Sequence, residues 1–261
     1  MIRAHSSFLC EGDRLVCTLD GDARATRGLL IVSGGNETRA GAWNGQALMA
    51  ERIAGEGFAV LRFDRRGVAD SEGANGGFRA SGPDIAAALA AFRELCPGLN
   101  RVVALGNCDA ASALMLTGGA GFDALVLSNP WTFEDDAADD VPAEQVRAHY
   151  RKRLADPAAL RRLLTNKVSL IQLFRSLKSA VRPAPPPPVS GLLETMRQGL
   201  GSFEGKVLFP VAGRDRTGGA FLSRWDKDDP RIRIHPEATH SFVEPGALDW
   251  YGAQVLEALR A

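Results

Sequence analysis

The chain alternates between short apolar runs and longer segments in which apolar residues recur every three or four positions. Short runs rich in β-branched residues predict buried strands, whereas the longer periodic segments predict helices. The expected strands are Ser6–Cys10, Arg14–Leu19, Gly28–Ser33, Ala59–Phe63, Arg101–Gly106, Ala124–Ser128, Lys206–Ala212 and Arg231–His235. The expected helices are Trp43–Glu56, Ser81–Cys96 with an N-cap signal at Ser81, a helix that includes Ala111–Leu116, a segment ending at Trp225, and Gly246–Arg260.

Strands and helices follow one another in turn after an N-terminal hairpin that closes across Glu11-Gly12-Asp13. This order is typical of a mostly parallel sheet with helices on both of its faces. We therefore expect an α/β protein with about eight strands in its sheet.

The alternation is interrupted between Asn129 and Phe203. This stretch contains an acidic run, a leucine- and arginine-rich segment with helical periodicity, and a run of prolines that fits neither a helix nor a central strand. We expect residues 129–203 to form an inserted helical cap with a Pro-rich connector, and residues 1–128 and 204–261 to form the core.

Composition narrows the class of protein. The chain has 261 residues, enough for a sizeable core without disulfides or metal. Its 31 basic and 31 acidic residues balance, which gives no support to nucleic-acid binding. The four cysteines show no metal-binding spacing, and neither a signal peptide nor a membrane span is visible. We expect a cytoplasmic protein with no metal, no cofactor and no stable membrane insertion.

A sharp turn joins the fifth expected strand to the following helix. Gly106-Asn-Cys108-Asp-Ala110 at this turn has the form of a nucleophile elbow, Gly-x-Ser-x-Gly, with cysteine at the reactive position and alanine for the last glycine. Small residues on either side of the nucleophile let strand and helix approach closely. Cys108 is therefore the candidate nucleophile. The alternative is a core cysteine, since free cysteines are often buried.

An activated cysteine needs a base and a group that orients the base. His240 follows the last expected strand, and Asp215 follows the strand before it. The order nucleophile, acid, histidine is that of α/β-hydrolases, so we expect Cys108, Asp215 and His240 to form a triad. Alternatively, His240 is a surface histidine and Asp215 a turn former. The other histidines, which fit less well, are His5 in the hairpin, His149 in the cap and His235 inside a strand.

An acyl-transfer site also needs donors for the oxyanion. One expected donor is the backbone N–H of Asp109, the residue after the nucleophile. The other is an N–H of Gly35 or Asn36, in the loop after an early strand, where glycine lets the backbone turn an amide toward a ligand. An ordinary glycine turn is the alternative for this loop.

Three segments carry a closer resemblance: Ser33–Arg39, Asp64–Gly73 and Gly106–Ala113. Together they resemble the type 1 hydrolases associated with the exosortase A system of bacteria. The resemblance implies the α/β-hydrolase fold and a cytoplasmic hydrolase, encoded alongside exopolysaccharide and protein-sorting functions, with cysteine where most relatives have serine. Dienelactone hydrolases and polyhydroxyalkanoate synthases also use an elbow cysteine, so the resemblance is compatible with both hydrolysis and acyl transfer.

We expect hydrolysis of an ester or thioester through an acyl-enzyme at Cys108. Two other functions stay open: transfer of the acyl group to an acceptor other than water, and a non-catalytic binding module.

Between Ala143 and Arg182, ten Lys or Arg stand against two Asp or Glu. A basic cap would attract an anionic or carrier-bound acyl donor, or touch an anionic membrane surface through nearby apolar residues. The alternative is an amphipathic helix pair with solvated charges. The apolar residues are Leu170, Ile171, Phe174 and Leu177.

Overall fold

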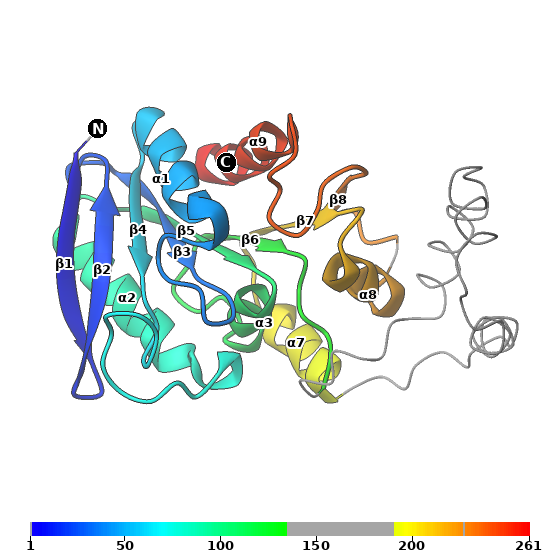
Figure 1. Ribbon diagram of the computed structural model, residues 1–261, viewed down its shortest axis with the longest axis horizontal. Coiled ribbons are helices and arrows are strands. Elements are labelled where there is room, and N and C mark those ends of the chain that lie inside the picture. The colour runs from blue at the N-terminus through cyan, green and yellow to red at the C-terminus, as the bar shows by residue number, and fades with distance from the viewer. Residues whose placement is uncertain (1, 135–190, 227) are drawn as a thin grey trace, which may run out of the picture. The chain divides into compact units, whose positions relative to one another are not determined.

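The computed structural model describes residues 2–134, 191–226 and 228–261 (Figure 1). The chain divides into two compact units, one comprising Met1–Thr132 with Gly191–Ala261 and the other Phe133–Ser190. Almost all of the second unit lies outside the described residues. The acidic run, the basic segment and the prolines of the expected cap therefore lie outside them too.

Eight strands form one sheet in the order β1-β2-β4-β3-β5-β6-β7-β8. The strands are β1 (Arg3–Cys10), β2 (Asp13–Asp20), β3 (Arg27–Val32), β4 (Ala59–Phe63), β5 (Arg101–Asn107), β6 (Ala124–Ser128), β7 (Lys206–Ala212) and β8 (Ile232–His235). β2 runs antiparallel to both of its neighbours, and every later pair in the sheet is parallel. This confirms the expected mostly parallel sheet of eight strands.

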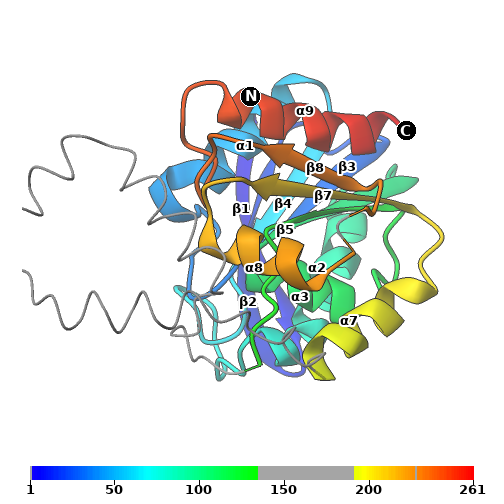
Figure 2. The ribbon, with the colours of Figure 1, turned by 90° about the vertical axis from the view of Figure 1, so that its right-hand side faces the viewer.

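Helices cover both faces of the sheet (Figures 1 and 2). One face carries α1 (Gly45–Gly55) and α9 (Ala247–Arg260), and the other carries α2 (Gly82–Leu95), α3 (Asp109–Leu116), α7 (Gly191–Gly201) and α8 (Arg216–Arg224). Successive residues of a strand point to opposite faces. Accordingly, Leu29 and Ile31 of β3 are buried under α1 and α9, while Leu30 and Val32 are buried on the other side. The apolar run of β3 is therefore explained by burial on both faces.

The first helix begins later than the sequence predicts. Trp43 and Asn44 have positive φ angles of 55° and 60°, so the expected helix from Trp43 starts at Gly45, after a short 3₁₀ turn at Ala42–Asn44. Left-handed backbone at two successive residues cannot continue an α-helix. The bend leaves the Trp43 side chain 82% exposed.

Ser81 is the N-cap residue of α2, as the sequence predicts, but its side chain does not cap the helix. The Ser81 hydroxyl makes no capping hydrogen bond and instead accepts one from Arg65 at 2.9 Å. The carboxylate of Asp84 is taken by Arg66, which donates from its backbone N–H and from Nε at 2.9 and 2.6 Å. Tertiary partners therefore replaced the local cap.

Residues 191–203, which the sequence places in the cap, pack on the core instead. Leu192, Met196 and Leu200 of α7 are buried in the same cluster as α3. A Cβ added at Gly199 would lie 2.1 Å from the carbonyl oxygen of Met115, so glycine is needed where α7 crosses the end of α3. The core resumes at Gly191 rather than at residue 204.

Candidate active site

The turn between β5 and α3 has the geometry of a nucleophile elbow. Cys108 stands at φ 61° and ψ −125°, a conformation that side-chain-bearing residues rarely adopt. A Cβ added at Gly106 would lie 2.8 Å from the carbonyl carbon of Ala110 and from the nitrogen of Ala111, so this position requires glycine. Ala110 is fully buried, and its methyl group fits where the elbow pattern has its second glycine.

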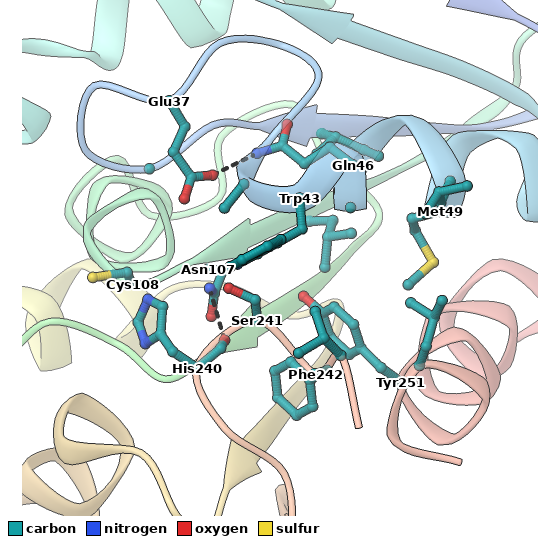
Figure 3. Close-up of a pocket in the computed structure, with 18 of the residues that line it drawn as sticks. Glu37, Trp43, Gln46, Met49, Asn107, Cys108, His240, Ser241, Phe242 and Tyr251 are labelled. Carbon is teal, nitrogen blue, oxygen red and sulfur yellow. Dashed lines mark hydrogen bonds between the residues drawn. The ribbon is translucent and has the colours of Figure 1, made fainter. Parts of the chain in front are cut away.

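The three expected triad residues meet at the carboxyl ends of their strands. Asp215 follows β7 and caps α8 by accepting the Gly218 N–H at 2.8 Å. Its Oδ2 also lies 3.0 Å from Nδ1 of His240, which follows β8. Cys108 lies beside the His240 ring and acts on its pKa, and Figure 3 shows the two side chains next to each other. Thiol, imidazole and carboxylate thus form one connected chain.

Electrostatics in this chain favour a charged imidazole. Burial alone would lower the pKa of His240, but the hydrogen bond and charge of Asp215, together with the neighbouring Cys108, raise it to about 10. Burial would likewise raise the pKa of Asp215, but the hydrogen bonds from His240 and from the backbone of α8 hold it below the usual value. The Asp215 carboxylate therefore favours the imidazolium form of His240, and the two titrate as a pair.

Two asparagines that the sequence did not single out hold the His240 backbone. Nδ2 of Asn107 and Nδ2 of Asn129 donate to the carbonyl of His240 at 3.2 and 3.3 Å. Asn129 also donates to Oδ1 of Asn107 at 3.0 Å and accepts the N–H of Ala212, the last residue of β7, at 2.8 Å. Both asparagines end strands next to the triad, and that position is the sequence signal that could have identified them.

The expected oxyanion donors behave differently from one another. Among the described residues, nothing accepts the backbone N–H of Asp109, at the start of α3. The N–H of Gly35, in contrast, donates at 2.7 Å to the carboxylate of Asp109. Arg65 donates to the carbonyl of Gly35 and lies 3.7 Å from the same carboxylate. The Asp109 side chain therefore occupies the Gly35 donor in this conformation.

Asn36, the other expected donor, does not line the pocket beside Cys108. It is exposed, and its Oδ1 accepts a hydrogen bond from Asn75 at 2.8 Å. The Gly35 N–H is thus taken by Asp109, and a donor role of the Asn36 N–H stays a prediction.

The other cysteines differ sharply from Cys108. Cys10, Cys17 and Cys96 are buried free thiols, and burial raises the pKa of each to about 11. Cys108 is partly exposed and lines a cavity. A buried thiol that keeps its proton is a poor nucleophile, so accessibility singles out Cys108.

A cavity of about 430 Å³ opens beside Cys108 and His240. Its walls come from β3, β5, the loop and helix of α1, the loop after β8, and α9 (Figure 3). This volume falls in the range of small-molecule pockets. Within residues 2–134, 191–226 and 228–261, no cluster of three or more His, Cys, Asp or Glu is arranged to hold a metal ion. None of the helices described there is long and apolar enough to cross a membrane.

Comparison with known proteins supports the fold. No protein-family model matches the sequence. No curated protein matches it either. Among solved structures, an esterase from Pyrococcus furiosus is 15% identical, with a TM-score of 0.65 over 99% of this chain and 90% of its own.

Two further structures are equally informative. An α/β-hydrolase from Penicillium sp. sh18 is 14% identical, with a TM-score of 0.67 over 100% of this chain and 98% of its own. A protein from Xanthomonas campestris described as an α/β serine hydrolase without a lid is also 14% identical, with a TM-score of 0.58 over 99% and 96%. The chain therefore has the α/β-hydrolase fold.

Proposed function

We propose that this chain, which has the α/β-hydrolase fold, is a hydrolase that cleaves an ester or thioester through an acyl-enzyme at Cys108. The observation that carries the proposal is the connected chain of Cys108, His240 and Asp215. Its thiol stands on a strained elbow at a cavity, next to a histidine that a carboxylate orients. This is the arrangement that nucleophilic catalysis requires.

In the first half of the proposed reaction, the Cys108 sulfur attacks the carbonyl carbon of the substrate. The thiolate is the reactive form of a cysteine, and His240 is the base that takes the proton of the thiol. The new C–S bond forms a tetrahedral intermediate, and collapse of that intermediate breaks the bond to the leaving group. His240 donates its proton to the departing oxygen or sulfur, so an alcohol or thiol leaves and the acyl group stays on Cys108.

In the second half, the neutral His240 takes a proton from water. The hydroxide attacks the acyl carbon, the C–S bond breaks, and a carboxylic acid is released with the thiolate and imidazolium restored. Asp215 keeps the imidazole ring oriented in both halves, because it holds Nδ1 at 3.0 Å.

The N–H of Asp109 is the proposed oxyanion donor. It lies at the N-terminus of α3, directly after the nucleophile, where the elbow fold places this donor. The N–H of Gly35 becomes a second donor only when the Asp109 carboxylate releases it, and Arg65 stands 3.7 Å away to keep the released carboxylate paired. One such donor contributes roughly 3–4 kcal/mol of transition-state stabilisation in enzymes where it has been removed.

The loops that resemble exosortase-associated hydrolases support a biological setting for the proposal. Under it, the enzyme serves bacterial exopolysaccharide or protein-sorting metabolism and acts on a small-molecule or carrier-bound acyl group. The basic segment 143–182, which we expect to attract an anionic or carrier-bound acyl donor, lies outside the described residues.

Intact-mass spectrometry tests the acyl-enzyme directly. The parent protein, Cys108→Ala and His240→Ala are mixed briefly with p-nitrophenyl and thioester acyl donors, and adduct mass and product release are followed in time. We expect one acyl mass on the parent, none on Cys108→Ala, and on His240→Ala an adduct that forms and disappears far more slowly. Cys96→Ala, which removes a buried thiol, is the matched control and should behave like the parent.

The opposite outcome is equally clear. If no donor produces an adduct and Cys108→Ala leaves all turnover unchanged, the proposed triad is wrong. A parent adduct that never turns over would instead favour a binding module that retains the fold.

A further inference from the structure

The cavity beside Cys108 is polar at one end and apolar at the other. In Figure 3, Cys108, His240 and Glu37 lie toward one side of the view, and Met49 and Tyr251 lie toward the opposite side, with Trp43 between them. A group bound to the sulfur of Cys108 can therefore extend from the polar end into the apolar part.

The apolar end is built from rigid parts of the fold. Ile31 of β3 and Leu105 of β5 are 2% and 4% exposed. Met49 of α1 is 3% exposed, and Tyr251 of α9 is fixed from behind, because its ring stacks on Phe242 with centroids 4.3 Å apart. Walls packed in this way are preformed, so they bind an apolar group without having to be ordered first.

Trp43 is the exception among these walls. Its ring lines the cavity, yet 82% of the residue is exposed. The left-handed φ of Trp43, 55°, keeps its side chain at the rim of the cavity. At this position the ring adds no stability to the fold through burial in the core. A large aromatic ring kept in water beside a nucleophile gains stability only when a ligand covers it.

The charges around the cavity select the kind of group that can enter. Glu37 lines it, and its carboxylate accepts a weak hydrogen bond from Gln46 at 3.4 Å (Figure 3). In the described part of the chain, no Lys or Arg lines the cavity, and none forms an ion pair with Glu37. His240, whose charged form Asp215 favours, also lines the cavity, but it is already paired with that carboxylate at 3.0 Å. A ligand carboxylate would therefore meet the like charge of Glu37 without an unpaired cation among the described lining residues.

We infer that this cavity holds the acyl part of the substrate, and that this acyl group is uncharged and largely aliphatic rather than one that ends in a carboxylate. The inference rests on the acyl-enzyme at Cys108 proposed above. Under this inference, Trp43 and Met49 bind the acyl chain of the substrate. Glu37 excludes acyl groups that end in a carboxylate, as in dicarboxylic half-esters and half-thioesters.

The test is a series of p-nitrophenyl esters with acetyl, butyryl and hexanoyl groups, with succinyl compared against 4-methylpentanoyl, which has the same shape without the charge. We expect kcat/KM to rise about fourfold for each added methylene until the cavity is filled. The 4-methylpentanoyl ester should be preferred to succinyl by about 100-fold, and Glu37→Gln should narrow this preference by about tenfold.

Two variants separate binding in the cavity from general damage. Trp43→Ala should reduce the hexanoyl-to-acetyl ratio of kcat/KM by about tenfold. Leu9→Ala, which removes another exposed apolar side chain, on β1, should leave that ratio unchanged.

The outcomes distinguish this inference from the proposed function. Acylation of Cys108 at rates that are independent of chain length, or faster with succinyl, overturns the acyl-pocket inference and leaves the acyl-enzyme intact. The same holds if a second series, with a fixed acetyl group and varied leaving groups, shows that Trp43 acts on the leaving group. Absence of acylation with every donor overturns the proposed function itself.

Discussion

Two groups of charged side chains in this molecule both contain short contacts between opposite charges, but they differ in burial and in what lies beside them. The first, the ion cluster, lies around β2 and β4 and consists of Asp20, Arg39, Arg62 and Asp64. The second is the triad of Cys108, Asp215 and His240. Asp20 and Asp64 are wholly buried, whereas the His240 side chain is 37% exposed and lines a cavity.

The difference shows that paired charges alone do not mark a functional site. In the ion cluster, Arg62 donates to Asp20 at 2.9 Å and to the carbonyl of Arg39, while Arg39 donates to Asp64 from its backbone and its guanidinium. These hydrogen bonds join β2, β4 and the loop that contains Arg39, and no group of the cluster lines the cavity beside Cys108. In the triad, the carboxylate serves the imidazole, and the imidazole faces a strained thiol at a cavity. Access and strain, rather than charge, separate the two.

The largest expected effect is on catalysis. His240→Ala should lower kcat/KM by about 10⁴-fold or more, because a histidine that moves protons in both halves of the reaction is lost. Steady-state kinetics with the best ester of the acyl series measures this. His5→Ala, on β1, is the matched control and should leave kcat/KM at the parent value. An equal loss in both variants would contradict the proposed role of His240.

The next effect is on stability and belongs to the ion cluster. Asp64→Ala should lower the free energy of unfolding by about 3–5 kcal/mol, because Arg39 is left without its buried partner. Urea unfolding measures this. Asp70→Ala removes the exposed carboxylate that also contacts Arg39, at 3.1 Å, and should cost less than about 1 kcal/mol. Equal losses would show that burial does not distinguish the two carboxylates.

A smaller effect is expected at Asn129, which holds both the His240 carbonyl and the end of β7. Asn129→Ala should lower kcat by about 100-fold with little change in KM, because the His240 carbonyl loses a donor and the catalytic ring shifts. The Ala212 N–H also loses its acceptor, so unfolding is measured in parallel. Asn100→Ala, an exposed amide before β5, should change neither quantity. A rise in KM alone would assign Asn129 to substrate binding instead.

The smallest effect is a shift in titration. Asp215 raises the His240 pKa, so Asp215→Asn should lower that pKa and the ring should lose its proton at a lower pH than in the parent. The sign follows because an imidazolium persists below its pKa, which lies near 10 in the parent. NMR titration of the His240 ring measures the shift. An unchanged or raised pKa in Asp215→Asn would mean that Asp215 does not stabilise the imidazolium.

Much of the fold could be predicted from the sequence because it depends on local pattern. β4, β6 and β7 begin and end where the apolar runs predict, since a strand buried on both faces needs such a run. The predictions failed where tertiary contacts outweighed local signals. Serine side chains often cap helices, but the hydroxyl of Ser81 makes no capping bond and accepts one from Arg65 instead. Trp43 fits a helical period, but its backbone turns left-handed.

For the candidate site, the sequence determined the candidates and their order: an elbow at Cys108, then Asp215, then His240, each after a strand. These signals are local, because a sharp turn needs small neighbours and a strand end exposes the next residue. Only the tertiary structure decided that the Gly35 N–H binds Asp109, 74 positions away, that two asparagines hold His240, and that the cavity is apolar away from Cys108. Such partners lie far apart along the chain, and a residue's own neighbours in sequence do not specify which distant segment will pack against it.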